Sequence, residues 1–157
     1  MRNKLDSYSE TLFHLINFRS RIYVESKKMI GIDYDSFMIL SCIGAHYLKN
    51  NTAQGLNWDS VWELTRSKKV DFHYNAKKLT IFAIANIMNL PKETVRRKIE
   101  GLKKKKFISH SSRDGLVPTN KVEEAIKPFA EQELIILSNF LKALKKHKSL
   151  DPLLNLK

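Results

Sequence analysis

The stretch of sequence that decides the fold is residues 84–102, which read IANIMNLPKETVRRKIEGL. Its first half is rich in small apolar side chains. Pro91 then suits the first turn of a new helix, because the missing N–H of proline costs nothing there. Beyond it, Val95, Ile99 and Leu102 recur at spacings of four and three residues, which place them on one helix face. The stretch therefore predicts two helices joined by a short corner, the second of them amphipathic.

The other face of the second predicted helix is polar and mostly basic. Thr94, Arg96 and Arg97 provide donors that can reach phosphate oxygens and the acceptor atoms of guanine or adenine. From Lys92 to Arg113 the chain has nine basic and two acidic residues, so this segment carries +7 of a formal net charge of +12. The alternative is that these basic side chains only face solvent and bind no specific partner. The coincidence of the charge with a helical corner favours a polyanionic partner instead.

Short extended segments are expected after the amphipathic helix. Beyond Lys106, the apolar pairs at residues 107–108 and 116–117 flank a polar turn that contains Gly115, a pattern that predicts a β-hairpin. Apolar periodicity predicts further helices before and after these elements, at residues 7–30, at 36–49, and from 120 to about 148.

A compact helix, a tight corner, a basic amphipathic helix and a hairpin together resemble the winged helix-turn-helix region of bacterial transcription regulators. The resemblance covers residues 84–102 with the following Phe107 and Ile108, and it places Ala85 at the small-residue position of the first helix and Asn89 at the turn. The helices before and after the motif look most like those of MarR-type repressors, which are homodimers held together by their terminal helices.

Three features depart from the MarR pattern. Lys98 stands where the superfamily usually has an apolar or small residue, and Arg113-Asp114-Gly115 replaces the Asp-x-Arg pattern of many wings. More chain than usual, including two tryptophans, also precedes Thr80. Inferences about a ligand of that family are therefore not carried over.

The resemblance implies a mainly α fold: a winged helix-turn-helix with a short β-hairpin wing and additional N- and C-terminal helices. A chain of 157 residues is expected to form a single domain, residues 1–157. The expected sub-regions are N-terminal helices for the core and dimerisation (1–50), a connector with a short helix (51–78), the winged helix-turn-helix (79–119) and a C-terminal dimerisation helix (120–157).

The expected function is that of a homodimeric regulator of transcription that binds duplex DNA sequence-specifically, with its recognition helix in the major groove and its wing near the minor groove. Arg96 and Arg97 are expected in the groove because arginine contacts guanine bidentately, although one of them could instead pair with a nearby glutamate. Thr80 suits a phosphate contact or simply a helix cap. The full set of expected DNA-binding residues is Thr80, Lys92, Glu93, Thr94, Arg96, Arg97, Lys98, Lys103, Ser109, His110, Ser111 and Arg113.

Self-association is expected through the first and last helices, because their apolar stripes exceed what one small domain can cover. The residues expected at this interface are Leu12, Leu15, Ile16, Leu134, Leu137, Leu141 and Leu144. Two interpretations remain open for the aromatic residues of the connector: Trp58, Trp62 and Tyr74 are either ordinary core or the lining of a pocket for a small-molecule effector.

Other classes of function find little support in the sequence. Cys42 is the only cysteine and lies in an apolar run, which indicates a buried thiol and is compatible with a reducing compartment. The five histidines are scattered without ligand spacing, so neither a metal site nor another cofactor is expected. The residues suggest no catalytic trio and therefore no enzyme. Without a secretion signal or a membrane-spanning stretch, the protein is expected to be cytoplasmic and to have no membrane partner.

Two other functions fit the same elements. One is a winged-helix module for protein interaction, in which the basic face docks an acidic partner. The other is an initiator of replication or partition that binds repeated DNA sites.

Overall fold

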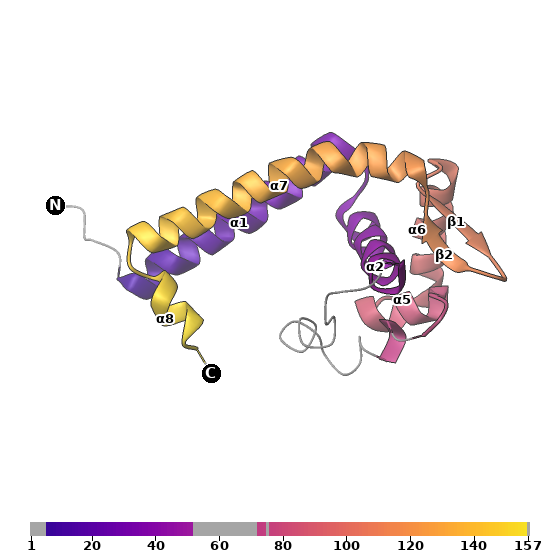
Figure 1. Cartoon of the computed structure of the whole chain (residues 1–157), viewed down its shortest axis with the longest axis horizontal. Coiled ribbons are helices and arrows are strands. Elements are labelled where there is room, and N and C mark those ends of the chain that lie inside the picture. The colour runs from indigo at the N-terminus through magenta and orange to yellow at the C-terminus, as the bar shows by residue number, and fades with distance from the viewer. Residues whose placement is uncertain (1–5, 52–71, 75, 157) are drawn as a thin grey trace. The chain divides into compact units, whose positions relative to one another are not determined.

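Helices make up most of the chain in the computed structural model of Figure 1. The structure describes residues 6–51, 72–74 and 76–156. Within these residues, one two-stranded antiparallel sheet accompanies the helices. A mainly helical fold with a small hairpin is therefore confirmed.

The chain divides into two compact units. One, here called the terminal unit, contains Met1–Ile32 and Ala125–Lys157, and the other, the central unit, contains Asp33–Glu124. Residues near the two ends of the chain pack with one another in the terminal unit, as Phe18 does with Phe140 at a ring-centroid distance of 5.0 Å.

In the central unit, α2 (Tyr34–Asn51) contacts α5 (Ile81–Met88), α6 (Lys92–Lys104) and the second hairpin strand. The sequence of α2 is apolar on nearly every side, which agrees with this position, because a helix with several neighbours must bury several faces. The most deeply buried side chains of the unit, each at most 2 % exposed, are Ile39, Leu40, Ile43, Leu79, Ile84, Val95, Ile99, Leu102 and Leu116.

The corner between α5 and α6 is formed by Asn89, Leu90 and Pro91. Asn89 has a φ of 52°, in the left-handed region that asparagine tolerates better than most residues. The backbone N–H of Leu90 then donates to the carbonyl of Ala85 at 3.1 Å, which closes the end of α5. Pro91 precedes the first residue of α6, where its fixed φ suits a helix start.

A hairpin follows α6, with β1 (Ile108–Ser111) paired to β2 (Gly115–Pro118). The register sets Ser109 opposite Val117 and His110 opposite Leu116. Beside this hairpin lies Leu79, whose carbonyl oxygen accepts the backbone N–H of Leu116 at 3.0 Å.

The terminal unit contains α1 (Ser7–Ile30), the C-terminal part of α7 (Asn120–Lys146) and α8 (Leu150–Leu154). In this unit α1 and α7 run alongside each other (Figure 1). Pro128 lies inside α7, which continues through it as one helix. Proline removes one N–H donor from a helix, and the neighbouring turns remain in place here.

In the described part of the chain, no helix combines the length and the apolar character needed to cross a membrane.

Candidate nucleic-acid interface

Helix α6 packs one apolar face against the rest of the central unit. Val95, Ile99 and Leu102 are at most 1 % exposed, so this stripe is fully covered. At 3.6 residues per turn, Arg97 lies on the opposite side of the helix. Arg97 is exposed and makes no hydrogen bond or ion pair with any residue that the structure describes. A full guanidinium fork is therefore available to a ligand at the middle of the open face.

Arg96 lies next to Arg97 but pairs with Glu93. Its Nε donates to Glu93 Oε2 at 2.9 Å and its Nη2 donates to Oε1 at 2.5 Å. The hydrogen bond to Glu93 raises the pKa of Arg96, and the same bond lowers the pKa of the Glu93 carboxyl. Both side chains are more than half exposed, at 52 % and 64 %. Water and salt screen such a pair, so a phosphate or base edge can replace the glutamate as partner.

Lys98 is used inside the central unit. Its Nζ lies 2.6 Å from Asp33 Oδ1, and the same carboxylate accepts the backbone N–H and the hydroxyl of Ser36 at 3.1 and 2.8 Å. Burial acts to raise the pKa of Asp33, but the hydrogen bonds from Lys98 and Ser36 outweigh it and bring the pKa to about 2. Lys98 thus joins α6 to the start of α2, where Asp33 is placed as a cap. This ion pair gives the charged side chain at position 98 a partner within the protein, where the resemblance implies an apolar or small residue.

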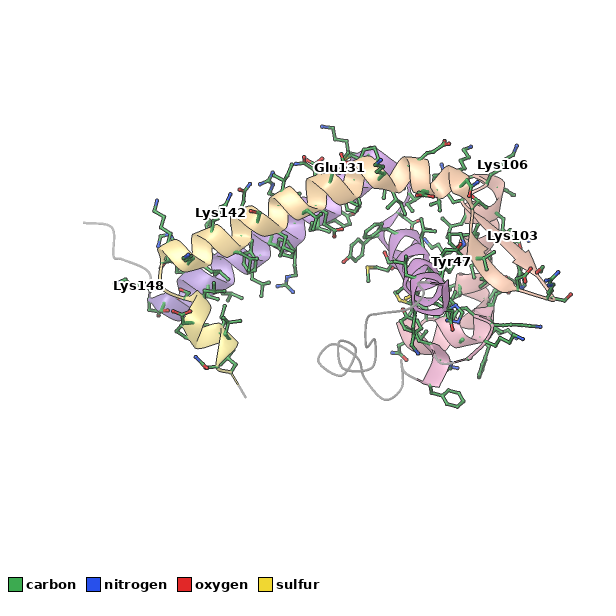
Figure 2. All side chains as sticks on the ribbon, viewed as in Figure 1. Tyr47, Lys103, Lys106, Glu131, Lys142 and Lys148 are labelled. Atoms are coloured by element: carbon green, nitrogen blue, oxygen red, sulfur yellow. The ribbon has the colours of Figure 1, made fainter. Side chains whose placement is uncertain are left out.

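Farther along α6, Lys103 pairs with Glu100 at 3.0 Å. The hydrogen bond from Lys103 lowers the pKa of Glu100. The carboxylates of Glu93 and Glu100 therefore neutralise part of the positive charge of this helix. Lys106 lies exposed just beyond the helix end (Figure 2).

Three of the expected DNA-binding residues lie at the N-terminal ends of α5 and α6. Thr80 is the N-cap of α5, since its Oγ1 accepts the backbone N–H of Ala83 at 3.1 Å. The capping interpretation of Thr80 is thus confirmed. At the start of α6, Lys92 is exposed and Thr94 is half-buried.

The hairpin turn adds a second basic element. Arg113 is almost fully exposed, with 92 % of its side chain open, and its Nε lies 3.6 Å from Asp114 Oδ1. Ser111 spans the turn: its hydroxyl donates to Asp114 Oδ2 at 3.2 Å and accepts the Asp114 N–H at 2.9 Å. Ser109 and His110 are exposed on β1. The turn is therefore held by its own hydrogen bonds while Arg113 projects from it.

Two lysines of the connector, Lys77 and Lys78, lie near this turn and are absent from the expected set of DNA-binding residues. Lys78 Nζ donates to the carbonyl of Ser112 at 2.5 Å. Lys77 and Arg113 both line an open cavity of about 550 Å³, together with His46 and Asn50 of α2. The signal in the sequence was the pair of lysines directly before Leu79. The backbone contact of Leu79 with the hairpin and the bond from Lys78 to Ser112 give that pair its position.

The residues expected at a dimer interface lie in the terminal unit. Leu134, Leu137 and Leu141 line an apolar groove of about 320 Å³ on α7. Leu12 and Leu15 line a second, mostly apolar groove of about 550 Å³ that is also bordered by α8. Ile16 is 48 % exposed, but Leu144 is only 2 % exposed and belongs to the core of the unit.

Of the three residues expected to line an effector pocket, the structure describes only Tyr74. Trp58 and Trp62 lie outside the described residues. Tyr74 is 7 % exposed and lies edge-on to the ring of His46, with centroids 6.2 Å apart. Burial raises the pKa of Tyr74, as it does that of the neighbouring Cys42. Both side chains have the surroundings of core residues.

Among the residues that the structure describes, one group of three side chains is arranged as metal ligands would be: Glu10, His14 and His147 of the terminal unit.

Comparison with protein-family models, curated proteins and solved structures finds no match to this chain.

Proposed function

We propose that this chain is a sequence-specific, duplex-DNA-binding regulator of transcription of the winged helix-turn-helix type. Helix α6 would enter the major groove, and the hairpin turn would lie against the neighbouring minor groove or its phosphates. The observation that carries the proposal is Arg97, which is exposed at the middle of the open face of α6 and makes no hydrogen bond or ion pair with any described residue. Arginine in that position can donate two hydrogen bonds to guanine O6 and N7.

The charge around Arg97 supports the same conclusion. Lys92 precedes it at the start of α6, and Arg113 with Lys77 supplies cations at the hairpin turn. Cations at both elements would release counterions from two stretches of phosphate backbone. Lys98 and Thr80 are left out of the proposed contacts, because each already has a partner within the protein.

The proposed regulator acts as a homodimer through the terminal unit. The two grooves around Leu12 and Leu141 expose apolar surface on helices that already cover each other in part. Burying such surface against a second copy would be favourable. A two-fold dimer presents two copies of α6, which predicts a palindromic DNA site.

The test begins with selection of bound duplexes from a random library, followed by fluorescence anisotropy at fixed salt. Arg97→Ala should weaken binding to the selected site by about 10- to 100-fold, corresponding to the loss of a bidentate base contact. Arg96→Ala should cost less, because Arg96 must first leave Glu93. Arg19→Ala removes the same charge from an exposed position of α1 and should leave the affinity unchanged.

A protein-interaction module is the second candidate, and the alternation of charge on α6 favours it. Glu93 and Glu100 pair with Arg96 and Lys103, so part of the face is neutral rather than purely basic. If the selection enriches no sequence and Arg97→Ala changes DNA binding no more than Arg19→Ala does, the DNA proposal fails. Capture of a partner protein that survives nuclease treatment and requires Arg97 would then support the second candidate.

A further inference from the structure

The terminal unit brings together three side chains that are far apart in the sequence. Glu10 and His14 are four residues apart on α1, so they share one helix face. His147 follows the last residue of α7, and its position is set by a tight turn in which Lys148 has a φ of 58° and the Ser149 N–H donates to the Leu144 carbonyl at 2.9 Å. The pairing of α1 with α7 is what makes the three meet.

The geometry of this cluster is close to that of a ligand set. One possible ligand atom from each residue lies within 4.8 Å of those from the other two. His147 Nδ1 lies 2.6 Å from Glu10 Oε1, and the rings of His14 and His147 stack with centroids 5.3 Å apart and planes inclined by 28°. In a tetrahedral zinc site the ligands lie about 2 Å from the metal, so small side-chain rotations would bring these atoms into range.

We propose that Glu10, His14 and His147 form a binding site for a divalent transition-metal ion, for which Zn²⁺ is the test ion. Two imidazoles and one carboxylate suit zinc, and three protein ligands leave a further coordination position for water. The Glu10 carboxylate faces His147, and an ion bound between Glu10 Oε1 and His147 Nδ1 would replace their direct contact. Glu10 is 22 % exposed and His147 36 % exposed at the side chain, so an ion can enter from solvent.

The proposed site goes beyond what the sequence alone suggests, because the histidines show no ligand spacing among themselves. Glu10 and His14 have a helical spacing that suits two ligands, but the third ligand comes from the opposite end of the chain. The proposal does not depend on DNA binding. A bound ion would connect the first turns of α1 to the end of α7 and so stabilise the terminal unit.

The test uses the full chain without a purification tag, with Cys42 kept reduced. Calorimetric titration with ZnCl₂ should give one ion per chain, and the ion should raise the thermal unfolding midpoint. His14→Gln and His147→Gln should each lower the affinity for Zn²⁺ by about tenfold or more, and Glu10→Gln should weaken it as well. His110→Gln, an exposed histidine of the central unit, should bind like the wild type.

Cobalt provides a second readout that does not depend on the variants. Co²⁺ bound to the wild-type chain should give the visible absorption of a tetrahedral site, and Zn²⁺ should displace it. Circular dichroism in EDTA checks that each variant keeps its helices. Equal zinc affinity in the wild type and in the Glu10, His14 and His147 variants would overturn the proposal, as would the absence of both zinc binding and a cobalt spectrum in the wild type. The cluster would then be a plain ion pair with a stacked ring.

Discussion

Gly115 lies so close to Leu79 that a Cβ at position 115 would be 2.7 Å from the Leu79 carbonyl oxygen. Gly115 also has a φ of 72°, which side chains of L-residues rarely adopt. The neighbouring hydrogen bond from the Leu116 N–H to the Leu79 carbonyl joins the backbone of the connector to the hairpin. This close approach places Lys77 and Lys78 beside the hairpin turn, and glycine is the residue that permits it.

Gly115→Ala should therefore destabilise the protein by about 2 kcal/mol, the sum of an unfavourable φ and a backbone clash. Urea unfolding followed by circular dichroism measures the change. The matched control is Gly101→Ala, where a new Cβ would meet nothing within 4 Å on α6. That substitution should stabilise the protein by about 0.5 to 1 kcal/mol, because alanine is the better helix former. Equal effects of the two substitutions would contradict the assigned contact with Leu79.

A second prediction separates phosphate contacts from base contacts. Lys77→Ala should weaken binding to the selected and to unrelated duplexes alike, because a lysine near the hairpin turn would contact phosphates. The slope of log K against log salt should become shallower by about 0.9, the value for one phosphate contact. Lys127→Ala on α7 removes one charge from an exposed position of the terminal unit and should leave the slope unchanged. A loss confined to the selected sequence would assign Lys77 a role in base recognition instead.

The elements near the corner could be predicted because their signals are local. Pro91, the stripe from Val95 to Leu102 and the turn around Gly115 each determine their own conformation from neighbouring residues. The ion pair of Lys98 could not be predicted from neighbouring residues, because its partner Asp33 lies 65 residues away in the sequence. The two lysines before Leu79 and the three side chains around His147 likewise depend on tertiary contacts. Local patterns predict helices and turns, whereas side-chain clusters require the packing that joins distant segments.

The Asp33–Lys98 pair predicts how stability depends on pH. Hydrogen bonds to the Asp33 carboxylate lower its pKa in the folded state to about 2, below the value near 3.9 of an unfolded chain. A depressed folded pKa contributes stability that is present above about pH 4 and is lost as the pH falls towards 2. Because the Asp33 side chain is 55 % exposed, solvent screening reduces the contribution to about 1 kcal/mol.

Asp33→Asn tests this contribution while keeping a side chain that can still cap α2. Its free energy of unfolding should be lower than that of the wild type at pH 6 and should approach the wild-type value near pH 2. Asp35 is an exposed acid in the first turn of the same helix. For Asp35→Asn, the free energy of unfolding should change between pH 6 and pH 2 by about as much as it does for the wild type. Parallel pH profiles for the wild type and Asp33→Asn would mean that the ion pair with Lys98 contributes nothing to stability in solution.

The last prediction concerns the groove on α7. Leu134 is 65 % exposed and Leu141 is 42 % exposed, although both are leucines on a helix whose opposite side is buried. Placing glutamine at both positions should leave the terminal unit folded, because neither side chain belongs to its core, but it should remove apolar area from the proposed contact between copies. The double variant should sediment as a monomer at micromolar concentrations, where we expect the wild type to sediment as a dimer.

Glu131→Gln provides the control for this pair of substitutions. Glu131 is an exposed side chain of the same helix (Figure 2), and glutamine there changes polarity without removing apolar surface. It should leave the dimer intact. The double variant should also bind a single half-site as the wild type does but lose the additional affinity for a palindrome, because only a dimer can engage both halves at once. A wild-type chain that is already monomeric at micromolar concentrations, or a double variant that stays dimeric, would contradict assembly through this groove.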